Sequence, residues 1–420
     1  MSSILVTGGR PLGGTVRASG AKNSALKLMA AALLAPGRSV LHNVPDISDV
    51  SVMAEVLRHL GVAVERAGSS LTIDASEVTS LEAPYELVAQ MRASIIVLGP
   101  LIARFGRARV ALPGGCNIGS RKIDMHVRGL ERLGVEVVFE HGFIEASAPD
   151  GLKGADVILD FPSVGATENL LMAAVLADGV TTVDNAAREP EIGDLVDMLV
   201  AMGARIEGRG SSTLEVTGVG ALAPAEHTTV GDRIEAGTFL VAGAVTGGAV
   251  TVTGFDPAHL EMVLTKMRLA GCEFDLYPDG ATVHRRDPLA AVDVATLPFP
   301  GFPTDMQAQF MAMMAIAEGS CVITENVFEN RFMFADELKR MGADIDIEGH
   351  RALVRGVQRL EGAPVRSPDL RGGAALVLAG LAAEGETRVG DVQHIMRGYE
   401  GFTDKLRSLG ADVQTVEERG

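Results

Sequence analysis

One pattern recurs six times along this chain of 420 residues and constrains the fold more than any other feature. Each copy has two apolar residues three positions apart, then a glycine, then a run of alternating apolar and polar residues. The copies start at Leu57, Leu130, Leu199, Met267, Leu338 and Leu406 and read LRHLGVAV, LERLGVEV, LVAMGARI, MRLAGCEF, LKRMGADI and LRSLGADV. Glycine readily takes the left-handed conformation that ends a helix. Each copy therefore predicts a surface helix that stops at the glycine and leads into strands.

A second segment recurs in phase with the first and is apolar on nearly all sides. Its six copies read NSALKLMAAALLAPG, ASIIVLGPLIARFG, GATENLLMAAVLADG, EAGTFLVAGAVTGG, MQAQFMAMMAIAEG and GGAALVLAGLAAEG. A helix that is hydrophobic all round is buried. One unit therefore reads strand, buried helix, strand, surface helix, strand, strand. We expect an α/β protein in which three units close around three buried helices. Six units then make two bodies, with a ligand site in the cleft between them.

The charge balance and the cysteines limit the partners and the compartment. The net charge is −17, whereas nucleic acid or an anionic membrane requires a basic surface. Cys116, Cys272 and Cys321 are too few and too scattered for a disulfide framework or a zinc site, which favours a reducing compartment. No secretory signal or bilayer-spanning run is recognisable in the sequence. We expect a cytoplasmic protein in which Cys272 and Cys321 are buried small hydrophobes.

Cys116 stands apart because it lies in the glycine-rich stretch LPGGCNIGSRK, between Leu112 and Lys122. Flanking glycines predict an exposed loop. The nearby Arg121 and Lys122 favour the thiolate, which is a nucleophile but cannot donate a proton. A bound anion has the opposite effect and holds the proton on sulfur. Whether the thiol is protonated before a substrate binds stays open at this point.

Other candidate residues stand at helix starts or among glycines. Lys22, Arg92 and Arg397 occur in GAKNSA, QMRASI and MRGYEG. Each could be a solvated cation, and Arg92 could form a structural ion pair at a helix end. Asp305, in GFPTDMQAQ, begins a buried helix, where the helix dipole lowers its pKa and burial raises it. A helix cap is the alternative role for Asp305. The glycines form no credible Walker or Rossmann motif, and no metal-ligand cluster is recognisable.

Eight segments spread over the whole chain resemble the UDP-N-acetylglucosamine 1-carboxyvinyltransferases, enolpyruvyl transferases of bacterial peptidoglycan synthesis. They are GAKNSALKLMAAALL, MRASIIVLGPLIARFG, LPGGCNIGSRKIDMH, SVGATEN, NAAREPEI, GFPTDMQAQ, DLRGGAALVLAGLAAEG and RGYEGF. The resemblance implies two inside-out α/β barrels of three repeats each. It implies a discontinuous domain of residues 1–20 plus 230–420, a catalytic-loop domain of residues 21–229, and an active site in the interdomain cleft. It also implies no cofactor, no metal, and a monomer or weak homo-oligomer.

The reaction implied is transfer of the enolpyruvyl group of phosphoenolpyruvate to the 3-hydroxyl of UDP-N-acetylglucosamine, with release of phosphate. It proceeds by addition and elimination through a tetrahedral ketal and is the first committed step of peptidoglycan synthesis, on which cell shape and division depend. The chemistry needs an acid for the methylene carbon and a base for the sugar hydroxyl. The resemblance assigns Cys116 as the acid and Asp305 as the base. It also makes Cys116 a target of the epoxide antibiotic fosfomycin, which family members with aspartate there escape.

The resemblance implies the substrate-binding residues as well. Lys22, Arg121 and Arg397 are the cations for phosphoenolpyruvate, and Lys22 and Arg397 also act in catalysis. Asn23 and Arg92 contact the nucleotide sugar. The remaining implied contacts are Lys122, Ile123, Asp124, Met125, Phe161, Pro162, Ser163, Val164, Gly165, Thr304 and Val327.

Several alternatives stay open from the sequence. A 3-phosphoshikimate 1-carboxyvinyltransferase shares the fold and phosphoenolpyruvate, but its phosphorylated acceptor calls for additional cations. A catalytically silent UDP-sugar-binding regulator has no need of an acid and a base. Asn23 could simply cap its helix, and Glu189 and Glu191 are interpreted as structural or domain-closure carboxylates. Some relatives carry other residues at Ile96 and Phe161, which leaves the uridine contacts open.

Overall fold

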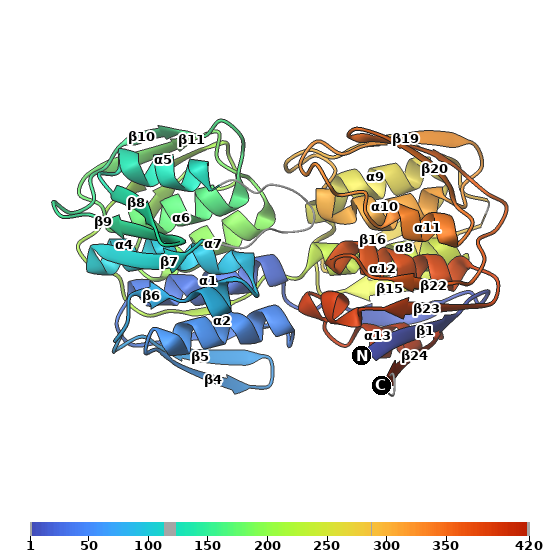
Figure 1. Ribbon diagram of the computed structural model, residues 1–420, viewed down its shortest axis with the longest axis horizontal. Coiled ribbons are helices and arrows are strands. Elements are labelled where there is room, and N and C mark those ends of the chain that lie inside the picture. The colour runs from blue at the N-terminus through green and yellow to red at the C-terminus, as the bar shows by residue number, and fades with distance from the viewer. Residues whose placement is uncertain (1, 113–122, 287, 418–420) are drawn as a thin grey trace. The chain divides into compact units, whose positions relative to one another are not determined.

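The computed structural model describes residues 2–112, 123–286 and 288–417, which form two compact units (Figure 1). The first unit comprises the described residues of Met1–Ser19 and Gly231–Gly420, and the second comprises those between Gly20 and Val230. The chain therefore passes between the units after Ser19 and again after Val230. The sequence placed these divisions after residues 20 and 229.

Three four-stranded sheets build the second unit, and all have one topology. The first two strands of each sheet are parallel, and the other neighbours are antiparallel. In spatial order the sheets are β14 (Glu226–Thr228), β3 (Arg38–His42), β5 (Ser70–Asp74), β4 (Ala63–Ala67); β6 (Glu82–Ala83), β7 (Arg107–Ala111), β9 (Phe143–Ser147), β8 (Glu136–Glu140); and β10 (Asp156–Ile158), β11 (Val180–Asp184), β13 (Thr213–Thr217), β12 (Arg205–Glu207). Because β14 comes from the last residues of the unit and pairs with β3 near its start, the unit closes on itself.

The first unit repeats this topology in three more sheets. They are β2 (Gly13–Arg17), β15 (Ala249–Thr253), β17 (Gly280–Arg285), β16 (Cys272–Tyr277); β18 (Val294–Ala295), β19 (Ser320–Thr324), β21 (Arg351–Arg355), β20 (Asp344–Glu348); and β22 (Pro364–Arg366), β23 (Glu386–Gly390), β1 (Ser2–Thr7), β24 (Asp412–Glu417). The N-terminal strand β1 pairs with β23 in the register Ile4–Val389 and also with β24. The N-terminal segment therefore completes two sheets of the unit, since β1 is the third strand of one sheet, between β23 and β24, and β2 is the first strand of another.

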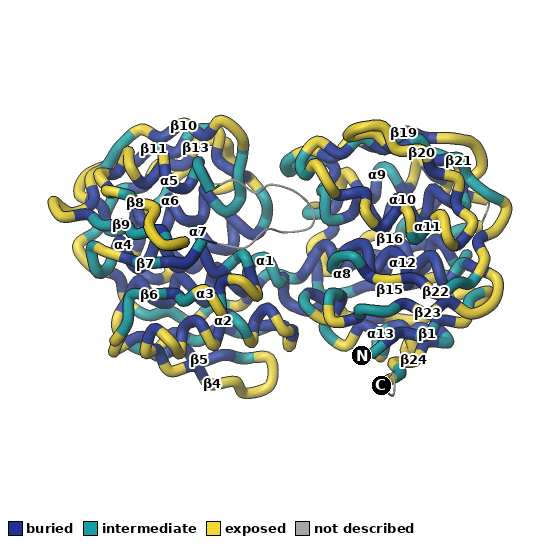
Figure 2. Tube along the Cα trace, in the orientation of Figure 1, coloured by how far each residue is buried: buried dark blue, intermediate teal, exposed yellow. Residues whose placement is uncertain are grey.

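Each sheet is accompanied by one buried helix, as the sequence predicts (Figure 2). The inner helices are α1 (Lys22–Ala31, continued by η1, Ala32–Leu34), α4 (Leu98–Phe105, preceded by η2, Arg92–Val97), α6 (Val164–Ala174), α8 (Arg233–Thr246), α10 (Gln307–Met314, preceded by η4, Thr304–Met306) and α12 (Leu370–Ala382). Small residues let these helices approach closely. A Cβ on Gly99 of α4 would lie 2.5 Å from the main-chain oxygen of Asn169 on α6. The α/β barrel prediction of three repeats around three buried helices is confirmed within each unit.

The outer helices end at the six glycines of the repeat. They are α2 (Ser48–His59), α5 (Asp124–Arg132), α7 (Pro190–Ala201), α9 (Glu261–Leu269, preceded by η3, Pro257–Leu260), α11 (Ala335–Arg340) and α13 (Phe402–Ser408), with α3 (Tyr85–Val88) and η5 (Val392–Arg397) besides. Gly61, Gly134, Gly203, Gly271, Gly342 and Gly410 all have φ between 89° and 105°. The sequence reasoning on this glycine is therefore confirmed in all six units. Helix α7 differs from the expected surface helix because it packs against α1 and buries most of its residues.

Each unit has its own hydrophobic core. Cys272 and Cys321 belong to the core of the first unit, where they are 4% and 2% exposed. Burial raises the pKa of the Cys272 thiol to about 11 and that of Cys321 to about 12, so both are inert small hydrophobes, as predicted. None of the described helices is both long enough and apolar enough to cross a membrane.

Candidate functional site

A carboxylate held by two buried arginines stands at the start of an inner helix of the first unit. Arg331 Nη2 donates to Asp305 Oδ1 at 2.8 Å, and Arg371 Nη2 donates to Oδ2 at 3.0 Å. The two arginine side chains are 3% and 2% exposed, whereas 24% of the Asp305 side chain is exposed. Pro303 precedes the helix and no side chain caps it, so the capping role considered for Asp305 is wrong. Asp305 presents an accessible carboxylate backed by two cations.

The arginines decide the ionisation of Asp305. Burial by itself raises its pKa, but the charges of Arg371 and Arg331 and their hydrogen bonds outweigh burial, and the pKa lies well below its usual range. The sequence could not decide between burial and the helix dipole because neither arginine was known to lie there. The carboxylate is ionised at neutral pH. It is free to accept a proton, although it is a weak base until another anion approaches.

Both arginines also offer unused donors. Among the described residues, Nη1 of Arg331 and Nη1 of Arg371 are buried and have no hydrogen-bond partner. A buried donor without a partner is costly, and a guanidinium is well suited to bind a carboxylate or phosphate. Neither arginine was predicted as a site residue from the sequence. The available signal for Arg371 was a cation at the start of the apolar segment DLRGGAALVLAG, whereas Arg331 in FENRF carried no such signal.

Thr304 and Val327 meet at Glu325, which is 2% exposed. Thr304 Oγ1 donates to Glu325 Oε2 at 3.0 Å, and the main-chain N–H of Val327 donates to Oε1 at 2.8 Å. Arg397 ends η5, and η5 packs against α12, the helix that carries Arg371. The structure therefore gathers Thr304 and Val327 beside Asp305, and places Arg397 in the same unit.

In the second unit, Lys22 begins the inner helix α1 and forms an ion pair. Its Nζ lies 2.7 Å from Asp49 Oδ2, and the two side chains are 12% and 4% exposed. Ala21 is the N-cap and Asn23 is the second residue of the helix, so the N-cap role considered for Asn23 is wrong. The main-chain oxygen of Asn23 accepts a hydrogen bond from Lys27 Nζ at 2.8 Å. This contact ties down the first turn, which carries both predicted residues.

The segments Ile123–Met125 and Phe161–Gly165 lie at the N-terminal ends of two neighbouring helices, α5 and α6. Ser163 caps α6 by accepting a main-chain N–H at 3.3 Å. A Cβ on Gly165 would lie 3.1 Å from the ring of His126 on α5, so a glycine suits this close approach. The two segments named from the sequence are therefore brought together.

Arg92 acts on the same region. It begins η2, which packs against α1 and α6. Burial and then the charge of Arg92 lower the pKa of His126 to about 4, so the imidazole is neutral. Its Nδ1 lies 2.8 Å from Asn169 Nδ2 on α6 and accepts that amide hydrogen. The helix N-termini of α1 and α6, with Lys22 and Arg92, form a region that favours an anionic ligand.

A buried carboxylate lies further along α6. Among the described residues, neither oxygen of Glu168 has a hydrogen-bond partner, and Lys27 Nζ is 3.6 Å from Oε1. Burial raises the pKa of Glu168 to about 7, and Glu191 and Glu189 add to this effect against Lys27. The influence of Glu189 and Glu191 on this interior group supports their structural interpretation.

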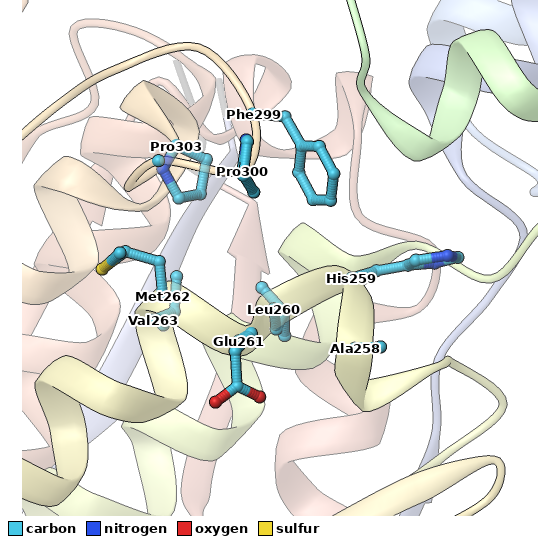
Figure 3. Close-up of a pocket in the computed structure, with 10 residues that line it drawn as sticks. Ala258, His259, Leu260, Glu261, Met262, Val263, Phe299, Pro300 and Pro303 are labelled. Carbon is cyan, nitrogen blue, oxygen red and sulfur yellow. The ribbon is translucent and has the colours of Figure 1, made fainter. Parts of the chain in front are cut away.

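The part of the surface that the structure describes has two hollows near the residues of interest. An open hollow of about 440 Å³ on the second unit is lined by Ile123, Asp124, Val127, Arg128 and Phe139, of which the first two were predicted to bind the nucleotide sugar. The pocket of the first unit drawn in Figure 3 lies between the start of α9 and the segment Phe299–Pro303. Its volume of about 10 Å³ is room for a single water, so it is not a substrate site.

Three predicted residues, Cys116, Arg121 and Lys122, lie outside the described residues. The others form two groups, one in each unit. Lys22, Asn23, Arg92 and the two segments at α5 and α6 belong to the second unit, and Thr304, Asp305, Val327 and Arg397 to the first. Within the described ranges, no three His, Cys, Asp or Glu side chains are grouped so as to hold a metal ion.

Comparison with known sequences covers nearly the whole chain. Residues 6–406 match the family model of EPSP synthase (3-phosphoshikimate 1-carboxyvinyltransferase). The chain is 57% identical over 415 residues to a UDP-N-acetylglucosamine 1-carboxyvinyltransferase of Corynebacterium jeikeium, covering 99% of both chains. It is 53% identical to the protein of that name from Desulfatibacillum aliphaticivorans, covering 99% of this chain and 100% of the relative.

Solved structures agree with the fold. The enolpyruvyl transferase NikO from Streptomyces tendae superposes with a TM-score of 0.89 at 28% identity, covering 99% of this chain and 98% of that one. An EPSP synthase from Acinetobacter baumannii superposes with a TM-score of 0.76 at 18% identity, covering 99% of this chain and 100% of that one. The second likeness concerns the fold alone.

Proposed function

The chain belongs to the EPSP synthase family and, within it, to the UDP-N-acetylglucosamine 1-carboxyvinyltransferases, and we propose from this that it transfers the enolpyruvyl group of phosphoenolpyruvate to the 3-hydroxyl of UDP-N-acetylglucosamine. The observation that carries the proposal is the 57% identity to a named relative over 99% of both chains. Phosphate is the second product. The step commits its acceptor to peptidoglycan synthesis.

The reaction balances with one proton donor and one proton acceptor. Protonation of the methylene carbon makes C2 of phosphoenolpyruvate electrophilic, and the sugar oxygen bonds to C2 as its own proton passes to a base. The resulting ketal then loses a proton from its methyl group, and the C–O bond to phosphate breaks with its electron pair. Each proton transfer needs a group positioned on the substrate.

Asp305 is the proposed base. Its carboxylate is ionised and accessible, with Arg331 and Arg371 behind it. The unused Nη1 donors of the two arginines suit an anionic substrate. Phosphoenolpyruvate carries negative charge, and a neighbouring negative charge raises the pKa of a carboxylate. Substrate binding therefore makes Asp305 a stronger base at the moment when the base is needed.

Lys22, Arg121 and Arg397 are the proposed cations for phosphoenolpyruvate. Lys22 supplies a point charge at the N-terminus of α1, where the helix dipole also favours an anion. Asn23, Arg92 and the segments that begin α5 and α6 are the proposed contacts of the nucleotide sugar. His126 beside Gly165 is neutral, so it adds no positive charge to that region.

Cys116 is the proposed acid, and fosfomycin is the proposed inhibitor that alkylates it. The protein is proposed to act in the cytoplasm, as a monomer or weak homo-oligomer, in cell-wall growth and division. It is proposed to work without a metal or cofactor.

The experiment that tests the function is product analysis. Phosphoenolpyruvate and UDP-N-acetylglucosamine are incubated with the protein, and proton and phosphorus NMR follow the mixture. We expect vinyl protons on the nucleotide sugar and one inorganic phosphate per vinyl group. Binding of UDP-N-acetylglucosamine with no vinyl product would instead favour the silent UDP-sugar-binding regulator.

A further inference from the structure

Tyr399 is fully enclosed in the first unit although it follows Arg397 by only two residues. It is 2% exposed, lies between η5 and α13, and belongs to the core cluster of the unit. The other two tyrosines, Tyr85 and Tyr277, are 56% and 44% exposed. Burying a phenol requires hydrogen-bond partners for its hydroxyl. These partners come from two of the inner helices.

The direction of the contact between Thr238 and Tyr399 follows from the number of protons. Thr238 Oγ1 on α8 donates its single hydrogen to the main-chain oxygen of Ile234 at 2.7 Å. The contact of 3.0 Å between Thr238 Oγ1 and the Tyr399 hydroxyl therefore has the tyrosine as donor. Gln309 Nε2 on α10 donates to the tyrosine oxygen at 3.2 Å. The hydroxyl thus connects α8 and α10.

The same amide reaches the proposed base. Gln309 Nε2 also donates to the main-chain oxygen of Asp305 at 2.9 Å. The Tyr399 hydroxyl is therefore one amide group away from the backbone of the residue proposed to accept the substrate proton. Gln309 is fully buried, and its amide nitrogen also lies 3.1 Å from Thr238 Oγ1, so its two hydrogens are shared among three oxygens.

The ring of Tyr399 lies beside the third inner helix. The guanidinium carbon of Arg371, on α12, is 5.2 Å from the ring centre, within the range of a cation–π contact. The same guanidinium donates to Asp305 Oδ2 from Nε at 3.3 Å and from Nη2 at 3.0 Å. Tyr399 therefore contacts both supports of Asp305: its backbone through Gln309 and its carboxylate through Arg371.

We propose that Tyr399 is a positioning residue for enolpyruvyl transfer. It holds Arg371 and η4, the short helix before α10, so that the Asp305 carboxylate keeps the orientation required to accept the proton. The inference rests on the proposed role of Asp305. The buried side chain of Tyr399 also anchors the segment that carries Arg397, which lies two residues earlier in the chain. Tyr399 touches no reacting atom and acts only through Asp305 and Arg371.

The charged groups around Tyr399 and Asp305 set the ionisation of both side chains. Arg331 and Arg371 face the carboxylate, and Asp232, the N-cap of α8, acts on both Arg371 and Tyr399. Burial raises the pKa of Tyr399 more than Arg371 lowers it, so the phenol is neutral at physiological pH and remains a donor. Tyr399, with Gln309 and Thr238, is therefore a fixed hydrogen-bonded support and takes no part in proton exchange.

The test is a set of double-mutant cycles on the full-length protein. Tyr399→Phe keeps the ring and removes the hydroxyl, and we expect kcat to fall on the order of tenfold while both KM values stay within about twofold. Tyr277→Phe is the matched control, because its hydroxyl also contacts a threonine, Thr282 Oγ1, at 3.2 Å in the same unit. The control should keep the parental kcat.

Coupling to Asp305 separates a positioning role from a merely structural one. If Tyr399 acts through Asp305, Tyr399→Phe should cause less than about a twofold further loss when added to Asp305→Asn. A fold defect would multiply with the loss from Asp305→Asn, because the two effects would be independent. Thr238→Val removes the partner of the hydroxyl and should likewise add little to Tyr399→Phe.

Each outcome decides a different claim. Unchanged kcat in Tyr399→Phe, or a loss that multiplies fully with Asp305→Asn, overturns the inference and leaves the proposed function intact. Parental kcat in Asp305→Asn overturns the proposed base and this inference with it. The residual rate of Asp305→Asn is measured at high enzyme concentration, with melting temperatures recorded for every variant so that loss of folded protein is corrected.

Discussion

Arg371 Nη2 lies 3.0 Å from Asp305 Oδ2, although 66 residues separate the two in the chain. Arg331 holds the other carboxylate oxygen at 2.8 Å. The pair joins η4, which precedes the inner helix α10, to the first turn of the inner helix α12, and keeps a charged carboxylate accessible there. Breaking a buried pair by removing one partner costs about 3–5 kcal/mol, so this arrangement is held firmly.

Asp305→Asn should lower kcat by about 100-fold or more, since the loss of a general base costs about that much. Asn keeps the shape and still contacts the arginines, so the nucleotide sugar should bind as before. The measurement is the initial rate of phosphate release together with calorimetric binding of UDP-N-acetylglucosamine. Asp404→Asn, on an exposed aspartate of the same unit, is the control and should show the parental rate. A fully active Asp305→Asn would contradict the assignment.

Lys22→Met should raise the KM for phosphoenolpyruvate by about tenfold or more, because tenfold corresponds to about 1.4 kcal/mol of lost binding. Its ammonium, held 2.7 Å from Asp49, offers a fixed charge to the substrate. Steady-state kinetics with varied phosphoenolpyruvate provide the measurement. Lys153→Met removes an exposed lysine of the same unit and should have no such effect. Equal kinetics of the two variants would show that Lys22 does not bind this substrate.

Glu168 should make the protein less stable as the pH rises. Its folded pKa of about 7 lies above the value of about 4.3 for an unfolded glutamate, so between these values the folded state binds the extra proton. The free energy of unfolding therefore falls as the pH rises from about 4.3 through about 7, by on the order of 3 kcal/mol.

Glu168→Gln should remove this dependence. Melting temperatures at pH 5.5 and pH 8 supply the comparison: the parent should lose more on going to pH 8 than the variant does. Glu55→Gln, at an exposed position of α2, is the control and should follow the parent. Equal losses in all three proteins would argue against a buried glutamate of raised pKa.

Cys116→Ser should strongly impair turnover and abolish inactivation by fosfomycin, because a serine hydroxyl is a far weaker acid and nucleophile than a thiol. Cys272→Ser should retain turnover and fosfomycin sensitivity, since Cys272 is 4% exposed and lies in the hydrophobic core. Phosphate release after preincubation with fosfomycin measures both effects. Similar behaviour of the two variants would refute the acid assignment.

Local patterning predicted most of the fold, because the features that define it repeat within short windows. The glycine after each outer helix and the apolar inner segments gave six units, and the structure has six matching sheets. The pairing of β1 with β23 depends on closure of the first unit across the whole chain, which periodicity does not encode. For the same reason, burial of α7 against α1 was not expected.

The residues of the candidate site were predicted less completely than the fold. Asp305 and Lys22 were recognisable from motifs, but their partners were not. Asp49 and Tyr399 act through contacts with residues distant in the chain, and no local spacing marks them. A structural ion pair at a helix end was considered for Arg92, and the same reasoning applied to DLRGGAALVLAG would have found Arg371.

The most direct test of the account is the choice of acceptor. Phosphate release from phosphoenolpyruvate is measured with UDP-N-acetylglucosamine and, separately, with shikimate 3-phosphate, and kcat/KM is compared for the two acceptors. We predict turnover with UDP-N-acetylglucosamine and none above background with shikimate 3-phosphate. Turnover with shikimate 3-phosphate in its place, or no phosphate release with either acceptor, would contradict the account.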